Sequence, residues 1–283
     1  GNWKTDNLIA LTTLGLVNRS ALDSLVTGSN FSRTLSMLSY LLRINSLKGS
    51  KKNIHAHYDL GNDFYKLWLD PSMTYSAAIF KDKNESLEKA QYNKYDRILD
   101  CLDKNSGSLL EVGCGWGGFA ERAQASGDFG IKGVTLSEEQ HDYARDRLGS
   151  KANIVLEDYR HQNKKFDNIV SIEMFEAVGE RYWQTYFNKI GNLLNKNGKA
   201  VIQTITINDS DFSRYRRGGD FIRSYIFPGG MLPSPSRFRS EVSKAGLKSD
   251  NEFYFGQDYA RTLEFWLKDF DQKHDQVKAL GFD

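Results

Sequence analysis

From residue 108 onward, short apolar runs of strand length alternate with longer segments whose apolar residues recur at helical spacing. The runs predict strands over 109–112, 131–136, 153–156, 166–172 and 199–207. The segments between them predict helices over 119–125, 138–148 and 181–194, the last ended by Asn197-Gly198. Strands that alternate with helices favour a mainly parallel sheet covered on both faces. The pattern therefore predicts an α/β fold of the Rossmann-like type.

The segments on either side of this region are predicted to be mostly helical. Residues 1–47 carry apolar residues at helical spacing with basic residues between them, and a helix over 84–104 has Ser86 as its N-cap. A charged stretch over 208–235 is followed by a helix near 235–245, a strand region over 247–255 and a helix over 258–280. We divide the chain into a basic helical extension, 1–53, with a hinge at 48–53, and a main domain, 54–283.

Charge distinguishes the extension from the rest of the chain. The whole chain has a net charge of +2, which is no nucleic-acid signature, but residues 1–53 hold seven lysines and arginines against two aspartates, a net +5. The extension is therefore either a helical cap on the main domain, which the pattern alone somewhat favours, or a basic apolar surface that contacts anionic lipid. Its helical stripe consists of Phe31, Leu35, Leu38, Leu41 and Leu42.

Composition is that of a globular protein. Hydrophobic residues make up 40% and charged residues 26% of the 283 residues, and the 13% of aromatic residues can line an apolar pocket. No apolar run reaches transmembrane length, and the first residues do not resemble a signal peptide. Cys101 and Cys114 lack the spacing of metal ligands, so a reducing, cytoplasmic compartment is the simple expectation.

The most informative motif is the glycine-rich segment EVGCGWGG at 111–118, which links the first predicted strand to a helix. Glycines allow a tight turn and a close approach of the backbone to a ligand. Gly113, Gly115 and Gly118 also fit the dinucleotide fingerprint, which alone is weak evidence. Glu111 favours S-adenosylmethionine (SAM), because an acid suits the amino group of its methionine part and would repel a pyrophosphate.

A pair of histidines raises the question of a metal. His55 and His57 flank one residue, but no cysteine follows and the nearby acids have no recognisable ligand spacing. We therefore expect a structural or substrate-lining role and predict no metal site.

Three segments together resemble one known family. They are HYDLGNDFY at 57–65, the glycine-rich segment at 111–118 and YIFPGGMLPS at 225–234. The chain resembles the cyclopropane-fatty-acyl-phospholipid synthase family, which includes the mycolic acid cyclopropane synthases, over residues 53–283. The resemblance implies a class I SAM-dependent methyltransferase fold with inserted lipid-pocket segments. It also implies action on the cis double bond of unsaturated phospholipid acyl chains, at the inner membrane surface.

The resemblance also implies a set of SAM-binding residues. Glu111 would lie near the amino group, and Gly113, Gly115 and Gly117 would form the turn. Tyr75 and Ser76 would cover the methionine end, Thr135, Leu136 and Gln140 would meet the ribose, and Tyr159 and Arg160 would flank the adenine. For Thr135 and Gln140, helix capping and surface polarity are the structural alternative.

The family's reaction centre is only partly retained. Glu176, Tyr259 and the backbone of Ile205 match family positions that hold a bicarbonate, the base for ring closure. A buried Glu176 needs hydrogen-bond partners, and Tyr259 is the one expected. Ala77 stands where many members have cysteine, and Gln203 and Ala177 stand where histidine is common. Gln203 can still donate a hydrogen bond to the anion, whereas Ala77 offers no side-chain donor.

The product, and with it the partners, stays open at this point. Cyclopropane ranks slightly ahead of a methylene or methyl-branched chain, and a methyl-branched product would require a separate reductase. A small-molecule methyltransferase and a non-catalytic lipid- or SAM-binding module are the alternatives, and a homodimer is not excluded. Aromatic residues favour the lipid, although each also suits a plain core: Phe175, Tyr225, Phe227 and Trp266. The chain ends at 283, where the family usually continues into further helices.

Overall fold

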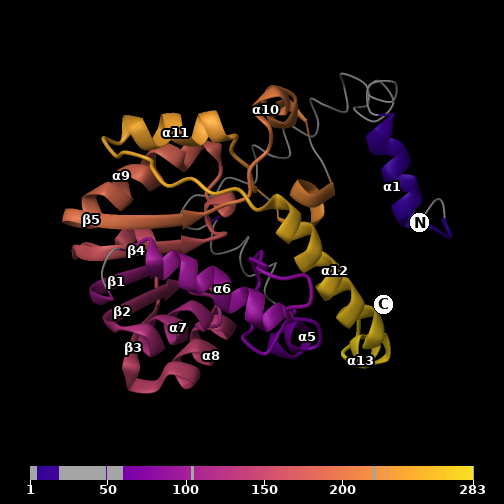
Figure 1. Cartoon of the computed structure of the whole chain (residues 1–283), viewed down its shortest axis with the longest axis horizontal. Helices are drawn as coiled ribbons and strands as arrows, with labels where there is room; N and C mark the ends of the chain where they lie inside the picture. Colours follow the sequence, from indigo (N-terminus) through magenta and orange to yellow (C-terminus); the bar gives the residue numbers. More distant parts are fainter. Residues whose placement is uncertain are drawn as a thin grey trace.

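The predicted parallel sheet is present, with five strands in the order β3-β2-β1-β4-β5 (Figure 1). The computed structural model describes residues 5–18, 49, 60–102, 105–218, 221–227 and 229–282. All neighbouring strands pair in parallel. The strands are β1 Ser106–Val112, β2 Asp128–Thr135, β3 Ala152–Leu156, β4 Phe166–Ile172 and β5 Leu194–Gln203.

Helices cover both faces of the sheet, as the apolar strands require. Leu109 and Leu110 of β1 are both fully buried, and they belong to different apolar clusters. The first cluster joins the sheet to α6 (Leu87–Asp100), α7 (Gly118–Ser126) and α8 (Glu138–Leu148), and the second joins it to α9 (Trp183–Leu193) and α11 (Pro235–Lys244). The strand order changes direction between β1 and β4, so a ligand crevice is expected where these two strands end.

Several helix and strand bounds follow directly from local chemistry. Ser86 is the N-cap of α6, and its hydroxyl accepts from the Lys89 N–H at 3.3 Å. Ser137 caps α8 in the same way through the Gln140 N–H. A hydroxyl at this position satisfies one of the free N–H groups of the first helical turn. The prediction for 138–148 is confirmed to the residue, as is the strand at 166–172.

The junction between α9 and β5 differs from the prediction. The helix ends at Leu193, and β5 begins at Leu194, before Asn197-Gly198. Asn197 has a φ of +65°, and the pairing with β4 shifts register beside it. The Asn-Gly pair therefore forms an irregularity inside the strand. At the other end β5 stops at Gln203, so 204–207 is not strand.

The segment 247–255 was predicted as a strand and is a loop, so that prediction is wrong. Asn251 has a φ of +52°, which interrupts an extended backbone, and its side chain donates to the Cys101 sulfur at 3.2 Å. The Arg97 guanidinium lies 3.9 Å from the centre of the Phe253 ring. Side-chain contacts thus hold this segment without a strand partner.

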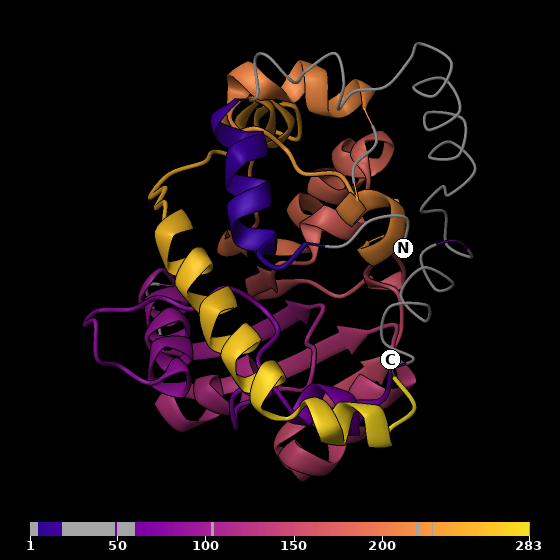
Figure 2. The same ribbon diagram turned by 90° about the vertical axis from the view of Figure 1, so that its right-hand side faces the viewer.

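The C-terminal helical prediction is confirmed, with one break. It consists of α12 (Gly256–Gln272) and α13 (His274–Ala279), separated at Lys273. Figure 2 shows α12 crossing the end of the sheet that faces the viewer. α12 is bonded to the loop before α6, because the Thr262 hydroxyl accepts a hydrogen bond from the Ala78 N–H at 3.0 Å. The shorter elements are α5 Asn62–Lys66, η1 Gly149–Lys151, η2 Tyr159–His161, η3 Phe175–Ala177, η4 Glu180–Tyr182, α10 Asp209–Arg217 and the π-helical turn Ile222–Ile226.

Within the predicted extension, the structure describes the helix α1, Leu8–Val17. Its apolar residues lie on all sides of the helix, so this part of the extension is helical, as predicted, but not amphipathic. Each of the following side chains is exposed: Leu8, Ile9, Leu11, Leu14, Leu16 and Val17. The stripe from Phe31 to Leu42, the hinge at 48–53 apart from Gly49, and the two histidines lie outside the described residues.

Candidate active site

The glycine turn follows β1, and its three glycines serve different purposes. Gly113, Gly115 and Gly117 all have positive φ, at +80°, +51° and +83°. A Cβ on Gly113 would lie 2.9 Å from the Met174 Cγ, and one on Gly117 would lie 3.0 Å from the Leu148 side chain. A Cβ on Gly115 would meet nothing within 4 Å. Packing therefore explains the first and third glycines, whereas Gly115 faces open space.

Glu111 lies just before this turn and carries an unsatisfied carboxylate oxygen. The residue is 3% exposed, and no described donor reaches its Oε2. Burial raises its pKa well above the usual range, against the attraction of Lys94 and Arg147. A buried oxygen without a donor needs a partner. The amino group of SAM would supply one, so the surroundings of Glu111 fit its predicted place beside that amino group.

The residues predicted to meet the ribose lie together at the end of β2. The Thr135 hydroxyl donates to the Gln140 Oε1 at 2.8 Å and accepts from the Ser137 N–H at 3.2 Å. Both Thr135 and Gln140 are buried, and Leu136 is partly exposed. The capping function belongs to Ser137, so capping does not explain the other two polar side chains.

Arg160 is held by a residue that the sequence analysis did not single out. Its guanidinium makes a two-pronged ion pair with Asp158, with Nε–Oδ1 at 2.8 Å and Nη2–Oδ2 at 2.6 Å. Asp158 is 5% exposed and lies two residues after β3. The Tyr159 ring packs edge-on against Tyr186 at 5.5 Å between ring centres. An acidic pair just after the third strand, Glu157-Asp158, was the available signal.

Tyr75 and Ser76 are fixed by contacts with α6 and α12. The Tyr75 ring packs against Trp266 at 5.3 Å. The Ser76 hydroxyl accepts from the Lys94 Nζ at 2.5 Å, and its carbonyl accepts from the Gln91 amide at 2.8 Å. Lys94 has no exposed surface, and this burial lowers its pKa to about 7. A buried lysine beside a predicted cofactor residue was not anticipated from the sequence.

The stretch before Tyr75 is held by a chain of hydroxyl groups. The Ser72 hydroxyl bonds to an Asp70 carboxylate oxygen and lies 2.6 Å from the Thr74 hydroxyl, which in turn lies 2.6 Å from the Tyr95 hydroxyl. A Cβ on Gly118 would lie 2.9 Å from that Tyr95 oxygen. Gly118 therefore allows this stretch to pack against the first turn of α7.

Glu176 lies at the end of the sheet, but its partner is not the predicted one. Its Oε1 accepts from the Ile205 N–H at 2.5 Å and from the Thr204 hydroxyl at 2.9 Å. No hydrogen bond joins it to Tyr259, so that prediction is wrong, and no described donor reaches its buried Oε2. The backbone N–H and the adjacent hydroxyl at the end of β5 satisfy the first oxygen instead. Burial, and then the negative charge of Glu173, raises the pKa of Glu176 to about 7.

Tyr259 comes from α12 and lies near the same acids. Burial raises the pKa of its hydroxyl, and the charges of Glu173 and Glu176 raise it further. Its ring packs on the aromatic cluster that also contains Trp68, Tyr75 and Trp266. The predicted catalytic residues Glu176, Tyr259, Gln203 and Ile205 are thus brought together at the carboxyl end of the sheet.

The principal residue that the sequence analysis missed is Glu173. Its Oε1 accepts from the Ala77 N–H at 2.9 Å and from the Gln203 amide at 2.8 Å. Its φ is +47°, a left-handed conformation that costs a non-glycine residue about 1–3 kcal/mol and often marks a functional site. Gln203, predicted to donate to a bound anion, donates to this carboxylate. The available signal was the pair of acids spaced three apart after β4, at 173 and 176.

Two of the aromatic residues offered for a lipid pocket are core residues. Phe175 is fully buried among Trp183, Tyr186 and Phe187. Trp266 is 7% exposed and packs on Trp68 and Tyr75. Phe227, by contrast, is 38% exposed, and the side chain of Tyr225 lies outside the described residues.

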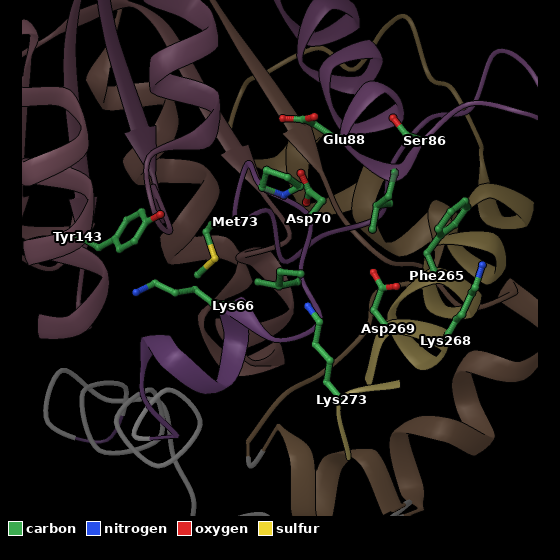
Figure 3. A pocket seen from close by; sticks show the side chains of 13 residues that line it. Lys66, Asp70, Met73, Ser86, Glu88, Tyr143, Phe265, Lys268, Asp269 and Lys273 are labelled. Carbon is green, nitrogen blue, oxygen red and sulfur yellow. The ribbon is translucent and has the colours of Figure 1, made fainter. Parts of the chain in front are cut away.

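One surface cavity is lined by none of the residues of this cluster of acids. It measures about 610 Å³ and is bordered by α5, α6, α8, α12 and the Leu69–Met73 stretch (Figure 3). None of the predicted site residues lines it, so its volume says nothing about the SAM site. Figure 3 shows its basic side chains, Lys66, Lys268 and Lys273, together with Asp70, Glu88 and Asp269. Among the described residues, no three acidic, histidine or cysteine side chains are grouped to hold a metal ion.

Comparison with known proteins settles the family. A sequence model of the mycolic acid cyclopropane synthetase family matches residues 45–283. The chain belongs to this family. Among the curated relatives, tuberculostearic acid methyltransferase UfaA1 of Mycobacterium tuberculosis is 39% identical over 248 residues, which are 83% of this chain and 58% of the relative. Cyclopropane-fatty-acyl-phospholipid synthase of Escherichia coli is 39% identical over 216 residues, 76% of this chain and 55% of the relative.

Structural comparison agrees with this membership. The crystal structure of mycolic acid cyclopropane synthase CmaA1 complexed with SAH and CTAB has a TM-score of 0.76 and 31% identity, covering 81% of this chain and 86% of that one. The predicted class I SAM-dependent methyltransferase fold is thereby confirmed. The chain spans somewhat more than half the length of these two curated relatives.

Proposed function

We propose that this chain transfers a methyl group from SAM to a carbon of the cis double bond in an unsaturated phospholipid acyl chain, with cyclopropane as the first expected product. The observation that carries the proposal is the meeting, at one end of the sheet, of a SAM-type turn with a cluster of acids. The turn contributes Glu111 and the open face of Gly115. The cluster contributes Glu173, Glu176 and Tyr259.

The reaction mainly requires that the alkene and the methyl group of SAM are positioned correctly. An isolated alkene is a weak nucleophile, so the sulfonium methyl group has to be held in line with it, away from water. SAM supplies the electrophilic methyl group when bound. Glu111 would hold its amino group, and Tyr75 and Ser76 would cover its methionine end. Acids near the receiving carbons would favour the positive charge that forms on the chain.

The acyl chain requires an apolar surface near these acids. Apolar side chains are exposed at the start of the π-helical turn, where Phe221, its N-cap, is 65% exposed and Ile222 is 52% exposed. Leu263 and Leu267 are exposed on α12, the helix that also carries Tyr259. We include these four residues in the proposed path of the acyl chain.

A bound bicarbonate is not part of this proposal. Two of the donors that the sequence offered to it already have carboxylate acceptors, because Gln203 bonds to Glu173 and the Ile205 N–H bonds to Glu176. An added anion would also face the negative charges of these two acids.

The test of the proposal is a product assay. The purified protein is incubated with labelled SAM and vesicles of dioleoyl phosphatidylglycerol without a reductant, and the acyl chains are analysed by mass spectrometry. We expect one labelled carbon in each modified chain and a cyclopropane ring. A methylene-bearing chain and no ring would show that the product is methylene and not cyclopropane. A reductase partner would then be needed to convert the methylene group into a methyl branch. Transfer to small amines but not to vesicles would contradict the lipid substrate.

We further propose peripheral contact with an anionic membrane through the extension, at the cytoplasmic face. The extension's net charge of +5 supports this, since each lysine or arginine near an anionic surface contributes about 1 kcal/mol. The exposed apolar residues of α1 add a surface that can enter the interface. No described helix is long and apolar enough to cross a membrane.

Vesicle sedimentation tests this contact. We expect binding to phosphatidylglycerol vesicles at low salt and a clear loss at high salt, because salt screens surface charges. Neutral phosphatidylcholine vesicles are the control and should bind weakly. Equal binding to both vesicles would contradict the electrostatic account.

A further inference from the structure

The side chain of Glu173 occupies the Gln203 amide, a donor that the sequence offered to a bound anion. We propose that its carboxylate is the base of the reaction and takes the proton that the family's bicarbonate would otherwise take. The assignment rests on the proposed methyl transfer to an alkene. It differs from that proposal in naming a group within the chain as the proton acceptor.

The geometry of the carboxylate is fixed by two donors from different parts of the sheet edge. The Ala77 N–H reaches Oε1 from the stretch before α6, and the Gln203 amide reaches the same oxygen from the end of β5. Gln203 is itself oriented by the Ala77 carbonyl, to which its Nε2 also donates, at 3.3 Å. One oxygen is therefore anchored, and the other is the one left to accept a proton.

The backbone places this carboxylate by an unusual conformation. Glu173 directly follows β4, has a φ of +47°, and donates its own N–H to the Gln203 carbonyl at 2.9 Å. A left-handed glutamate persists only where its surroundings hold it there. The same turn contains Glu176, whose anchored oxygen is bonded to Ile205 and Thr204 instead. The two acids therefore have separate donors.

A buried cation favours the ionised form of this base. Lys94 lies fully buried on α6, bonded to Ser76, the neighbour of Ala77. No described carboxylate oxygen lies within 4.0 Å of its Nζ, so its charge is not consumed by a close ion pair. Its attraction opposes the rise in the Glu173 pKa that burial causes. The Glu173 charge raises the pKa of Glu176, so the pair resists the ionisation of both acids, and Lys94 favours Glu173 as the ionised one.

The proposed step balances without a further reactant. A C–C bond forms between the methyl carbon and one alkene carbon while the C–S bond of SAM breaks, which leaves a cation on the other alkene carbon. Glu173 then takes a proton from the added methyl group. The electron pair of that C–H bond closes the ring. If a hydride first moves from the methylated carbon to the cationic carbon, the same proton loss from the methyl group forms a methylene double bond instead. The carboxyl group afterwards returns its proton to water.

The experiment compares Glu173→Gln and Glu173→Gly with the wild-type chain in buffer freed of bicarbonate and in the same buffer with bicarbonate added. Dioleoyl phosphatidylglycerol vesicles and SAM are the substrates, and the lipid product is measured. Wild-type turnover should be equal in both buffers. Glu173→Gln should lose about 10²–10⁴-fold in both, as removal of a general base does. Glu173→Gly vacates the space, so added bicarbonate should restore part of its turnover.

Two controls separate a chemical role from a structural one. SAM affinity by calorimetry should stay within about threefold in both variants, because the SAM-type turn is untouched. Glu180 lies shortly after Glu176 in the chain, and its carboxylate pairs with Arg216 of α10 at 2.7 Å. Glu180→Gln removes this acid and should keep wild-type turnover. Wild-type dependence on bicarbonate, or a fully active Glu173→Gln, would overturn the assignment. No wild-type turnover in either buffer would instead overturn the methyl transfer on which it rests.

Discussion

Replacing Gly115 by leucine should lower SAM affinity at least about 100-fold while the protein remains folded. A Cβ at this position meets no protein atom within 4 Å, so the added side chain enters the space in front of the turn. That space is where the cofactor has to approach the backbone. The measurement is calorimetric titration with SAM, together with a thermal unfolding curve.

Gly149→Leu is the matched control for this change. Gly149 also has a positive φ, at +55°, and a Cβ there also meets nothing within 4 Å, but it lies after α8 rather than in the turn. Both variants carry the strain of a non-glycine residue at a positive φ, about 1–3 kcal/mol. We expect similar losses of stability and an unchanged SAM affinity for Gly149→Leu. Wild-type affinity in Gly115→Leu would refute the placement of SAM at this turn.

Gly113 and Gly115 are equivalent in the motif but have different surroundings in the structure. Gly113 was expected to admit the cofactor, but a Cβ there runs into Met174, which follows β4. A bulky residue at 113 would therefore disturb the junction of β1 and β4 as well as any ligand. The spacing of the motif predicts a turn, whereas only the packed structure shows which glycine has open space beside it.

The sheet was predictable because its signals are local. The adjacent Leu109 and Leu110 pack on opposite faces, so an uninterrupted apolar run marks a strand that is buried on both sides. Ser86 and Ser137 mark their helix starts within three residues of the backbone groups that they bond. Such signals can be recognised in the sequence without knowledge of the tertiary structure.

The anchoring of Glu173 was not predictable from local signals. Its donor Ala77 is 96 positions away in the chain, and Gln203 is 30 positions away. The sequence shows alanine and glutamine at 77 and 203, where the family often has cysteine and histidine, but not the carboxylate that the Ala77 N–H and the Gln203 amide hold. The same holds for the partner of Glu176, which is a backbone N–H and therefore has no residue signature.

Replacing Glu176 by glutamine should lower turnover about 10²–10³-fold, the usual cost of removing one group that stabilises charge in the transition state. The amide retains an oxygen for Ile205 and Thr204, so the fold of the turn is preserved. What disappears is the negative charge near the cation on the acyl chain. Turnover is measured with saturating SAM and vesicles, and Glu180→Gln again serves as the control for loss of an acid on this loop.

The pH dependence gives a second measurement of the same role. The pKa of Glu176 is raised to about 7, first by burial and then by Glu173, so the carboxylate is largely protonated below that pH and ionised above it. Wild-type turnover should therefore rise as the pH increases through about 7 and then level off. Glutamine does not titrate, so Glu176→Gln should lose this rise and leave only the titration of Glu173, shifted to lower pH because a neighbouring negative charge is gone. A Glu176→Gln variant with wild-type turnover and an unaltered profile would show that Glu176 serves only to close the turn against β5.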